Sequence, residues 1–178
     1  MARTIKKILA GVAVLFAVIL IWGAFKPSHF RVQRSTTINA AADKVFPLIN
    51  DFHNWPAWSP WEKLDPNMKR TLTGPANGQG SAYAWDGNNK AGSGRMEITG
   101  SEPFSKVAIK LDFIKPMEGH DVVEFTLEPS GTSTKVIWEM SGPLTYPGKV
   151  MTVFVSMDRL IGPDFETGLA NMKAAAEK

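Results

Sequence analysis

The middle of the chain alternates apolar and polar residues with a period of two. In the runs 106–113, 122–128 and 135–140, every second residue is large and apolar, and the residues between them are mostly charged, small or hydroxyl-bearing. This period places successive side chains on opposite faces of a strand, and one dry face beside one wet face is typical of an antiparallel sheet. Shorter patterns predict further strands at 30–38, 68–73, 81–86 and 94–101, which makes about seven strands.

Two other segments have a helical period. Across 39–62, apolar residues recur every three or four positions until Pro56 and Pro60 interrupt them, which predicts a short, kinked helical region. From Tyr146 onward the same spacing returns, and the Gly162-Pro163-Asp164 step predicts two helical pieces or a kink at that point.

These elements together predict the fold class. The apolar stripe of a long C-terminal helix has to be buried against the dry face of a strongly curved antiparallel sheet. The sequence therefore predicts an α+β grip. A sheet with this pattern could also form a sandwich or a lipocalin-like barrel, but the long terminal helix counts against both.

An apolar segment precedes the predicted domain. Residues 8–25 carry no charge, and a helix of this length spans about 27 Å, close to the ~30 Å hydrocarbon core of a bilayer. The alternative is a signal peptide, but the apolar run is longer than the usual ~7–15 residues and no A-x-A-like cleavage site follows it. We therefore expect a single-pass membrane anchor in residues 1–26, crossing the bilayer through residues 8–25, and a domain in residues 27–178.

The charge of the chain belongs to this anchor rather than to the domain. The whole chain carries +3, but residues 27–178 have 16 basic and 17 acidic side chains, a net charge of −1. The sequence therefore predicts no nucleic-acid partner. Arg3, Lys6 and Lys7 before the apolar segment favour a cytoplasmic N-terminus, so the domain is expected outside the cytoplasm at the cell membrane.

Three groups of residues carry a resemblance to a known superfamily. They are Arg34-Ser35 with Ile38-Asn39-Ala40 and Lys44-Val45-Phe46, the tryptophan-proline corner at 51–61, and Asp164-Phe165-Glu166-Thr167-Gly168-Leu169-Ala170-Asn171-Met172-Lys173. Over about residues 30–177 the chain resembles the START-like (SRPBCC) superfamily and its polyketide cyclase/dehydrase-type family. The resemblance implies a helix-grip fold with a deep, mostly apolar cavity between the sheet and the C-terminal helix.

The resemblance implies a class of ligand but not an activity. Members bind lipids, sterols, polyketides or other hydrophobic molecules, a minority are enzymes, and there is no shared catalytic residue set to transfer. The first hypothesis is a membrane-anchored domain that binds a hydrophobic small molecule or lipid. The alternatives are a polyketide cyclase/dehydratase-like enzyme or a non-catalytic membrane interaction module. No cofactor is predicted, and the sequence predicts no oligomeric state.

The predicted ligand-cavity residues are large side chains on the dry face of the strands and on the apolar stripe of the terminal helices. They are Trp58, Tyr83, Trp85, Met96, Ile98, Ile109, Leu111, Phe113, Phe125, Trp138, Met140, Phe154 and Met157. The same residues could equally fill an ordinary core, and the sequence does not distinguish a filled core from a hollow one.

Charged residues within the strand-like runs are the polar cavity candidates. They are Arg34, Arg95 and Glu97; Arg34 shares the alternation of Val32, so it is expected to point inward and meet a carboxylate such as Glu97. A pair of this kind could orient a polar ligand group or transfer protons. The more ordinary role of such residues is to cap one end of the sheet or to face solvent.

Tryptophans and histidines are the remaining candidates for a ligand or metal site. Trp55, Trp58 and Trp61 form either an aromatic platform at the cavity mouth or a packed corner, and the two roles can coexist. His29, His53 and His120 lie far apart, and the chain has no cysteine, so no metal site is predicted.

Overall fold

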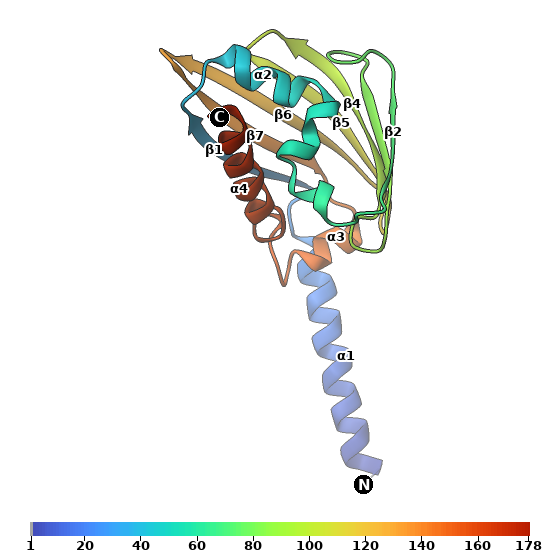
Figure 1. Ribbon diagram of the computed structural model, residues 1–178. Coiled ribbons are helices and arrows are strands. Elements are labelled where there is room, and N and C mark those ends of the chain that lie inside the picture. Colours follow the sequence, from blue (N-terminus) through green and yellow to red (C-terminus); the bar gives the residue numbers. More distant parts are fainter. Residues whose placement is uncertain (1) are drawn as a thin grey trace.

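The computed structural model, which describes residues 2–178, contains a curved sheet, a long C-terminal helix across it, and an N-terminal helix that projects from one end (Figure 1). The elements in chain order are α1 (Ala2–Ala24), β1 (His29–Ile38), α2 (Ala42–Asn50), η1 (Phe52–Ala57), η2 (Pro60–Lys63), β2 (Lys69–Thr73), β3 (Ala82–Asp86), β4 (Ser93–Glu102), β5 (Lys106–Lys115), β6 (Gly119–Ser130), β7 (Ser133–Pro143), α3 (Tyr146–Met151) and α4 (Met157–Ala176).

The seven strands form one antiparallel sheet in the order β1-β7-β6-β5-β4-β3-β2. The apolar residues of the alternating runs lie on its dry face, where Val123, Phe125, Val136 and Trp138 are buried. Helix α4 packs against this face through an apolar stripe that includes Phe165. The predicted helix-grip architecture is therefore confirmed.

The C-terminal helix differs from the prediction in where it is interrupted. Helix α4 continues through Gly162 and Pro163, and the break lies earlier, in the linker 152–156 between α3 and α4. Ser156 explains the new start, because its hydroxyl oxygen accepts a hydrogen bond from the backbone N–H of Arg159, as an N-cap residue does. Pro163 removes one internal helix hydrogen bond, but packing of the surrounding stripe holds the helix together.

One end of the sheet gathers several chain segments. The start of β1 pairs with the end of β7 there, through His29 and Pro143. The β5–β6 hairpin and the β3–β4 hairpin lie at the same end, as the pairs Gly119–Phe113 and Ser93–Lys115 show. Helix α1 meets the domain here (Figure 1). We call this the anchor end.

Contacts with α3 hold the C-terminal turns of α1. The Tyr146 hydroxyl donates to the backbone oxygen of Leu20 at 2.8 Å, and Lys149 Nζ donates to that of Ala24 at 3.0 Å. The last carbonyls of a helix have no internal partners and carry partial negative charge, so a lysine there is favourable. Residues 3–24 have the length and composition of a membrane span, and the mean hydropathy of an 18-residue window within them is 2.3; a signal sequence would have the same properties.

Candidate functional site

Two adjacent spaces lie between the sheet and α4. The first, which we call the inner cavity, has a volume of about 170 Å³ and a mainly apolar wall built from η1, η2, β3–β7 and α4. The second, the outer cavity, has about 540 Å³ and opens at the anchor end, between the β5–β6 hairpin and α3. Phe113, Met140 and Ile161 belong to both walls, so the two spaces are adjacent and share these side chains at their border.

Seven of the predicted cavity residues line the inner cavity: Tyr83, Trp85, Met96, Leu111, Phe113, Trp138 and Met140. Met157 lines the outer cavity instead. Trp58, Ile98, Ile109 and Phe125 are buried in the filled part of the core, outside both walls. Trp58 and Phe125 show why, since their rings contact each other with centroids 5.9 Å apart and leave no space between them.

Phe154 was placed in the cavity wall by its helical spacing, and this placement is wrong. Its side chain is 69% exposed, because residues 152–156 form a linker and not a helix face directed at the sheet.

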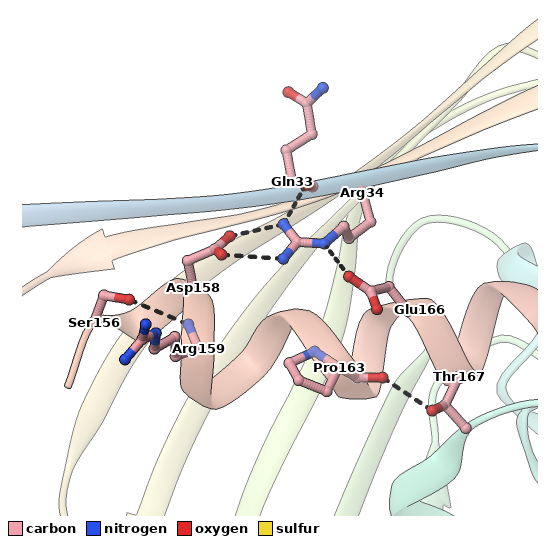
Figure 2. A network of polar contacts seen from close by, with 8 residues as sticks. All are labelled: Gln33, Arg34, Ser156, Asp158, Arg159, Pro163, Glu166 and Thr167. Carbon is pink, nitrogen blue, oxygen red and sulfur yellow. Dashed lines mark hydrogen bonds and ion pairs between the residues drawn. The ribbon is translucent and has the colours of Figure 1, made fainter.

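The predicted inward pair between Arg34 and Glu97 is also wrong. Arg34 lies on the inner side of β1 but meets α4, where Nε donates to Glu166 at 2.7 Å and Nη1 donates to Asp158 at 2.7 Å (Figure 2). These bonds raise the pKa of Arg34 above its usual value and lower that of Asp158. Because β1 is the edge strand beside α4, and β4 lies four strands away, Arg34 reaches the helix rather than Glu97.

Arg95 and Glu97 form their own ion pair on β4, with Nη2 and Oε2 2.8 Å apart. Both side chains are more than a third exposed, and neither contributes to the walls of the two cavities. A surface pair of this kind contributes little to stability.

Glu62, which the sequence pattern does not indicate, forms a hydrogen-bonded cluster in the inner wall with Tyr83 and Arg70. Its side chain is 6% exposed; Oε1 accepts a hydrogen bond from the Tyr83 hydroxyl at 2.6 Å, and Oε2 accepts one from Arg70 Nε at 2.7 Å. Burial is the larger cause, and the hydrogen bond to Glu62 the second, of a pKa of Tyr83 well above its usual value. The hydroxyl therefore stays protonated and donates a hydrogen bond to the carboxylate. Both carboxylate oxygens are therefore satisfied within the protein.

Tryptophans make up much of the remaining wall. Trp55 and Trp61 line the inner cavity together with Trp85 and Trp138, whereas Trp58 packs behind them. Trp55 and Trp58 donate their indole N–H groups to backbone oxygens of Ile49 and Leu48, at 3.0 and 2.7 Å. The tryptophan corner is thus a packed element and part of the wall at once.

Trp138 differs from the other wall tryptophans because its indole N–H is buried without a hydrogen-bond partner. Its ring lies between Phe165, with centroids 4.0 Å apart, and Phe125, with centroids 5.0 Å apart. A buried donor of this kind is costly unless an acceptor satisfies it.

Several wall residues were missed by the sequence analysis. These are Ser59, Glu62, Met68, Ala91, Val123, Ile161, Asp164 and Phe165, whereas Trp55 and Trp61, predicted as an aromatic platform or a packed corner, do line the cavity. Val123 and Phe165 follow the same periodic patterns as the residues that were selected. Glu62, Met68 and Ala91 lie in turns and short helices, where no period indicates a facing direction.

A seven-stranded antiparallel sheet with a C-terminal helix across it and an apolar cavity between them defines the helix-grip class of fold. The sequence profile of the family described as "Polyketide cyclase / dehydrase and lipid transport" matches residues 29–177. The chain belongs to this family. No protein with a curated description matches it in sequence.

Solved structures share the fold at low identity. The Zhui aromatase/cyclase from Streptomyces sp. R1128 aligns with a TM-score of 0.61 at 15% identity, over 84% of this chain and 94% of that one. The Aha1 dimer from Colwellia psychrerythraea aligns with a TM-score of 0.59 at 16% identity, over 83% and 96% of the two chains. A protein from Thermobifida fusca gives a TM-score of 0.62 at 15% identity, over 82% and 92%.

Proposed function

We propose that this protein is a membrane-anchored domain that binds a hydrophobic small molecule or lipid between its sheet and α4. The observation that carries the proposal is the apolar inner cavity, which adjoins an outer cavity open at the anchor end. For comparison, an engineered apolar cavity of about 150 Å³ binds benzene, and ligand pockets usually enclose about 300–1,000 Å³. The inner cavity suits a ring or a short chain, and the two spaces together suit a larger molecule.

The position of the opening supports the membrane part of the proposal. The Tyr146 and Lys149 contacts hold the end of α1 beside α3, whose residues Gly148 and Met151 also line the outer cavity. Met117, in the β5–β6 hairpin, is 61% exposed at this same end. If α1 spans a bilayer, the opening faces the surface that supplies hydrophobic ligands.

The hydrogen bonds of Glu62 favour a structural role over a catalytic one for this carboxylate. The other carboxylates of the cavity walls are Asp164, Glu118 and Asp121. A cyclase or dehydratase needs an acid or base that can reach the substrate. Glu62 instead directs both oxygens to Tyr83 and Arg70, so these three groups stabilise the wall.

Tryptophan quenching by 1-bromodecane tests the binding proposal, because bromine quenches indole emission at contact. The full chain would be studied in phosphatidylcholine nanodiscs with the Trp22→Phe substitution, which removes the indole of α1. We expect saturable quenching of the cavity tryptophans, and its loss in Val123→Phe, which places a ring in the inner cavity. Quenching that rises linearly with bromodecane in both proteins would contradict a binding site, and circular dichroism would verify that both are folded.

The intact mass of the membrane-extracted protein tests the anchor. We expect the uncleaved chain in the membrane fraction after alkaline extraction. A mature protein that begins after residue 25 would show that the apolar segment is a signal peptide. A reporter fused after Lys178 would give the orientation, for which we expect the domain outside the cytoplasm.

A further inference from the structure

A carboxylate interrupts the dry face of β6. The inward positions of this strand are Asp121, Val123, Phe125 and Leu127, so Asp121 occupies a place where the pattern requires an apolar side chain. It is 7% exposed and lines the outer cavity. The same wall includes Phe113 and Met140, which also line the inner cavity, so the carboxylate belongs to the space that adjoins the inner cavity.

Asp121 has no partner in the described part of the chain: its side chain makes neither a hydrogen bond nor an ion pair there. The nearby charged groups are engaged elsewhere, since His120 Nδ1 lies 2.7 Å from Asp112, and Glu118 is largely exposed in the hairpin. Burial raises the pKa of Asp121 to about 6, so above neutral pH it is an ionised, largely buried group, with His120 and Asp112 close enough to affect its pKa. Such a group is unfavourable unless a donor meets it.

The protein backbone makes room for this carboxylate. Gly142 of β7 lies beside it, and a Cβ atom at residue 142 would collide with Oδ1 of Asp121. The absence of a side chain at residue 142 lets the carboxylate lie over β7, within the wall of the outer cavity.

We propose that Asp121 binds the polar end of an amphiphilic ligand, and that this end carries a hydrogen-bond donor, either an ammonium or a hydroxyl group. The inference rests on the proposed binding function and adds the ligand class. The apolar part of the ligand occupies the inner cavity, while its donor meets the carboxylate in the adjoining outer cavity. An ammonium binds more tightly than a hydroxyl because it also compensates the charge.

Three probes with the same apolar chain test this inference: decylamine, decanol and decyl methyl ether. Each would compete with 1-bromodecane for the full-length Trp22→Phe protein in nanodiscs at pH 8, where Asp121 is ionised. We expect the amine to bind at least about tenfold more tightly than the ether, with the alcohol between them, as for a hydrogen bond to a charged group. Dissociation constants would be corrected for partition into protein-free nanodiscs.

Asp121→Asn provides the decisive variant, since it keeps the shape, removes the charge and adds an N–H donor. We expect the preference for the amine to disappear and the ether to bind as well as the alcohol. Glu128→Gln is the matched control, because it removes the same charge from an exposed position of the same strand, outside both cavity walls, and should retain the order of affinities.

The outcomes separate the inference from the function on which it rests. If the three probes bind equally to the wild type, or if Asp121→Asn keeps the amine preference, the role of Asp121 is refuted while the binding function stands. If no probe competes with bromodecane, the binding function itself fails and the inference fails with it. The order of affinities in the wild type remains informative even if the variant does not fold.

Discussion

Substitution of Val123 by isoleucine tests whether the inner cavity is a real space. Val123 is buried on β6 and lines the cavity of about 170 Å³. At ~24 cal/mol per Å³, a void of this size lowers stability by about 4 kcal/mol relative to a filled core. One added methylene that enters this space should stabilise the fold by about 0.8 kcal/mol. For a domain of this size, that corresponds to a rise in melting temperature of about 2–3 °C.

Val136→Ile is the matched comparison for this prediction. Val136 lies on the same dry face, on β7, but is fully buried and outside both cavities. The same extra methylene must there overpack the core, which costs about 1–3 kcal/mol. The two variants should therefore shift the melting temperature in opposite directions.

The assay is thermal unfolding followed by circular dichroism, on delipidated protein in one detergent. Removal of bound lipid matters because an occupied cavity has no room for the new methylene. If Val123→Ile destabilises the protein as much as Val136→Ile does, the inner cavity is closed in solution and the reasoning is refuted. Val123→Ile should also weaken bromodecane binding, since it reduces the available volume.

Three further predictions concern the polar groups. Tyr83→Phe leaves one oxygen of Glu62 without a donor and should lower the free energy of unfolding by about 1.5–3 kcal/mol, measured by urea titration; an unchanged midpoint would show that water replaces the hydroxyl. Asp121 has its pKa raised from 3.8 to about 6, so the folded state binds the proton more tightly, and its contribution to stability falls as pH rises from about 4 to 6. Asp121→Asn should therefore raise the free energy of unfolding at pH 7 by up to about 3 kcal/mol and remove this part of the pH dependence. If the variant keeps the same pH dependence of the free energy of unfolding, other groups, such as Asp112, cause it. Arg34→Lys keeps the charge but loses the forked contacts with α4, so limited proteolysis should cut near the start of α4 faster than in the wild type, and equal rates would argue against a role in fixing the helix.

The sheet could be predicted from the sequence because one face is wet and the other is dry. The alternation across 106–113, 122–128 and 135–140 corresponds to β5, β6 and β7. The period also holds two residues further back, at Asp121, where the inward position is charged. Extending the pattern to that residue would have identified it from the sequence alone.

The rest of the site depends on contacts that no local pattern records. Glu62 lies in a short 3-10 helix without a facing direction, and its partners Arg70 and Tyr83 come from two later strands. Arg34 was correctly placed on the inner side of its strand, but its partners depend on which element crosses that strand. The division of the dry face into filled and hollow parts depends on how side chains from many elements pack, which periodicity does not specify.

The fixation of α4 at both ends determines how a ligand can exchange. At its start, Gly162 leaves space for the guanidinium of Arg34, whose carboxylate partners lie on both sides of that glycine. At its end, Lys173 Nζ donates to the backbone oxygen of Thr37 at 2.7 Å, and Glu177 accepts the backbone N–H of Asn39 at 2.6 Å. Both ends of α4 are therefore held by hydrogen bonds to β1 and to the residue that follows it. We therefore expect the exchange rate to depend on contacts of the β5–β6 hairpin and α3, which line the outer cavity, more than on the contacts of α4 with the sheet.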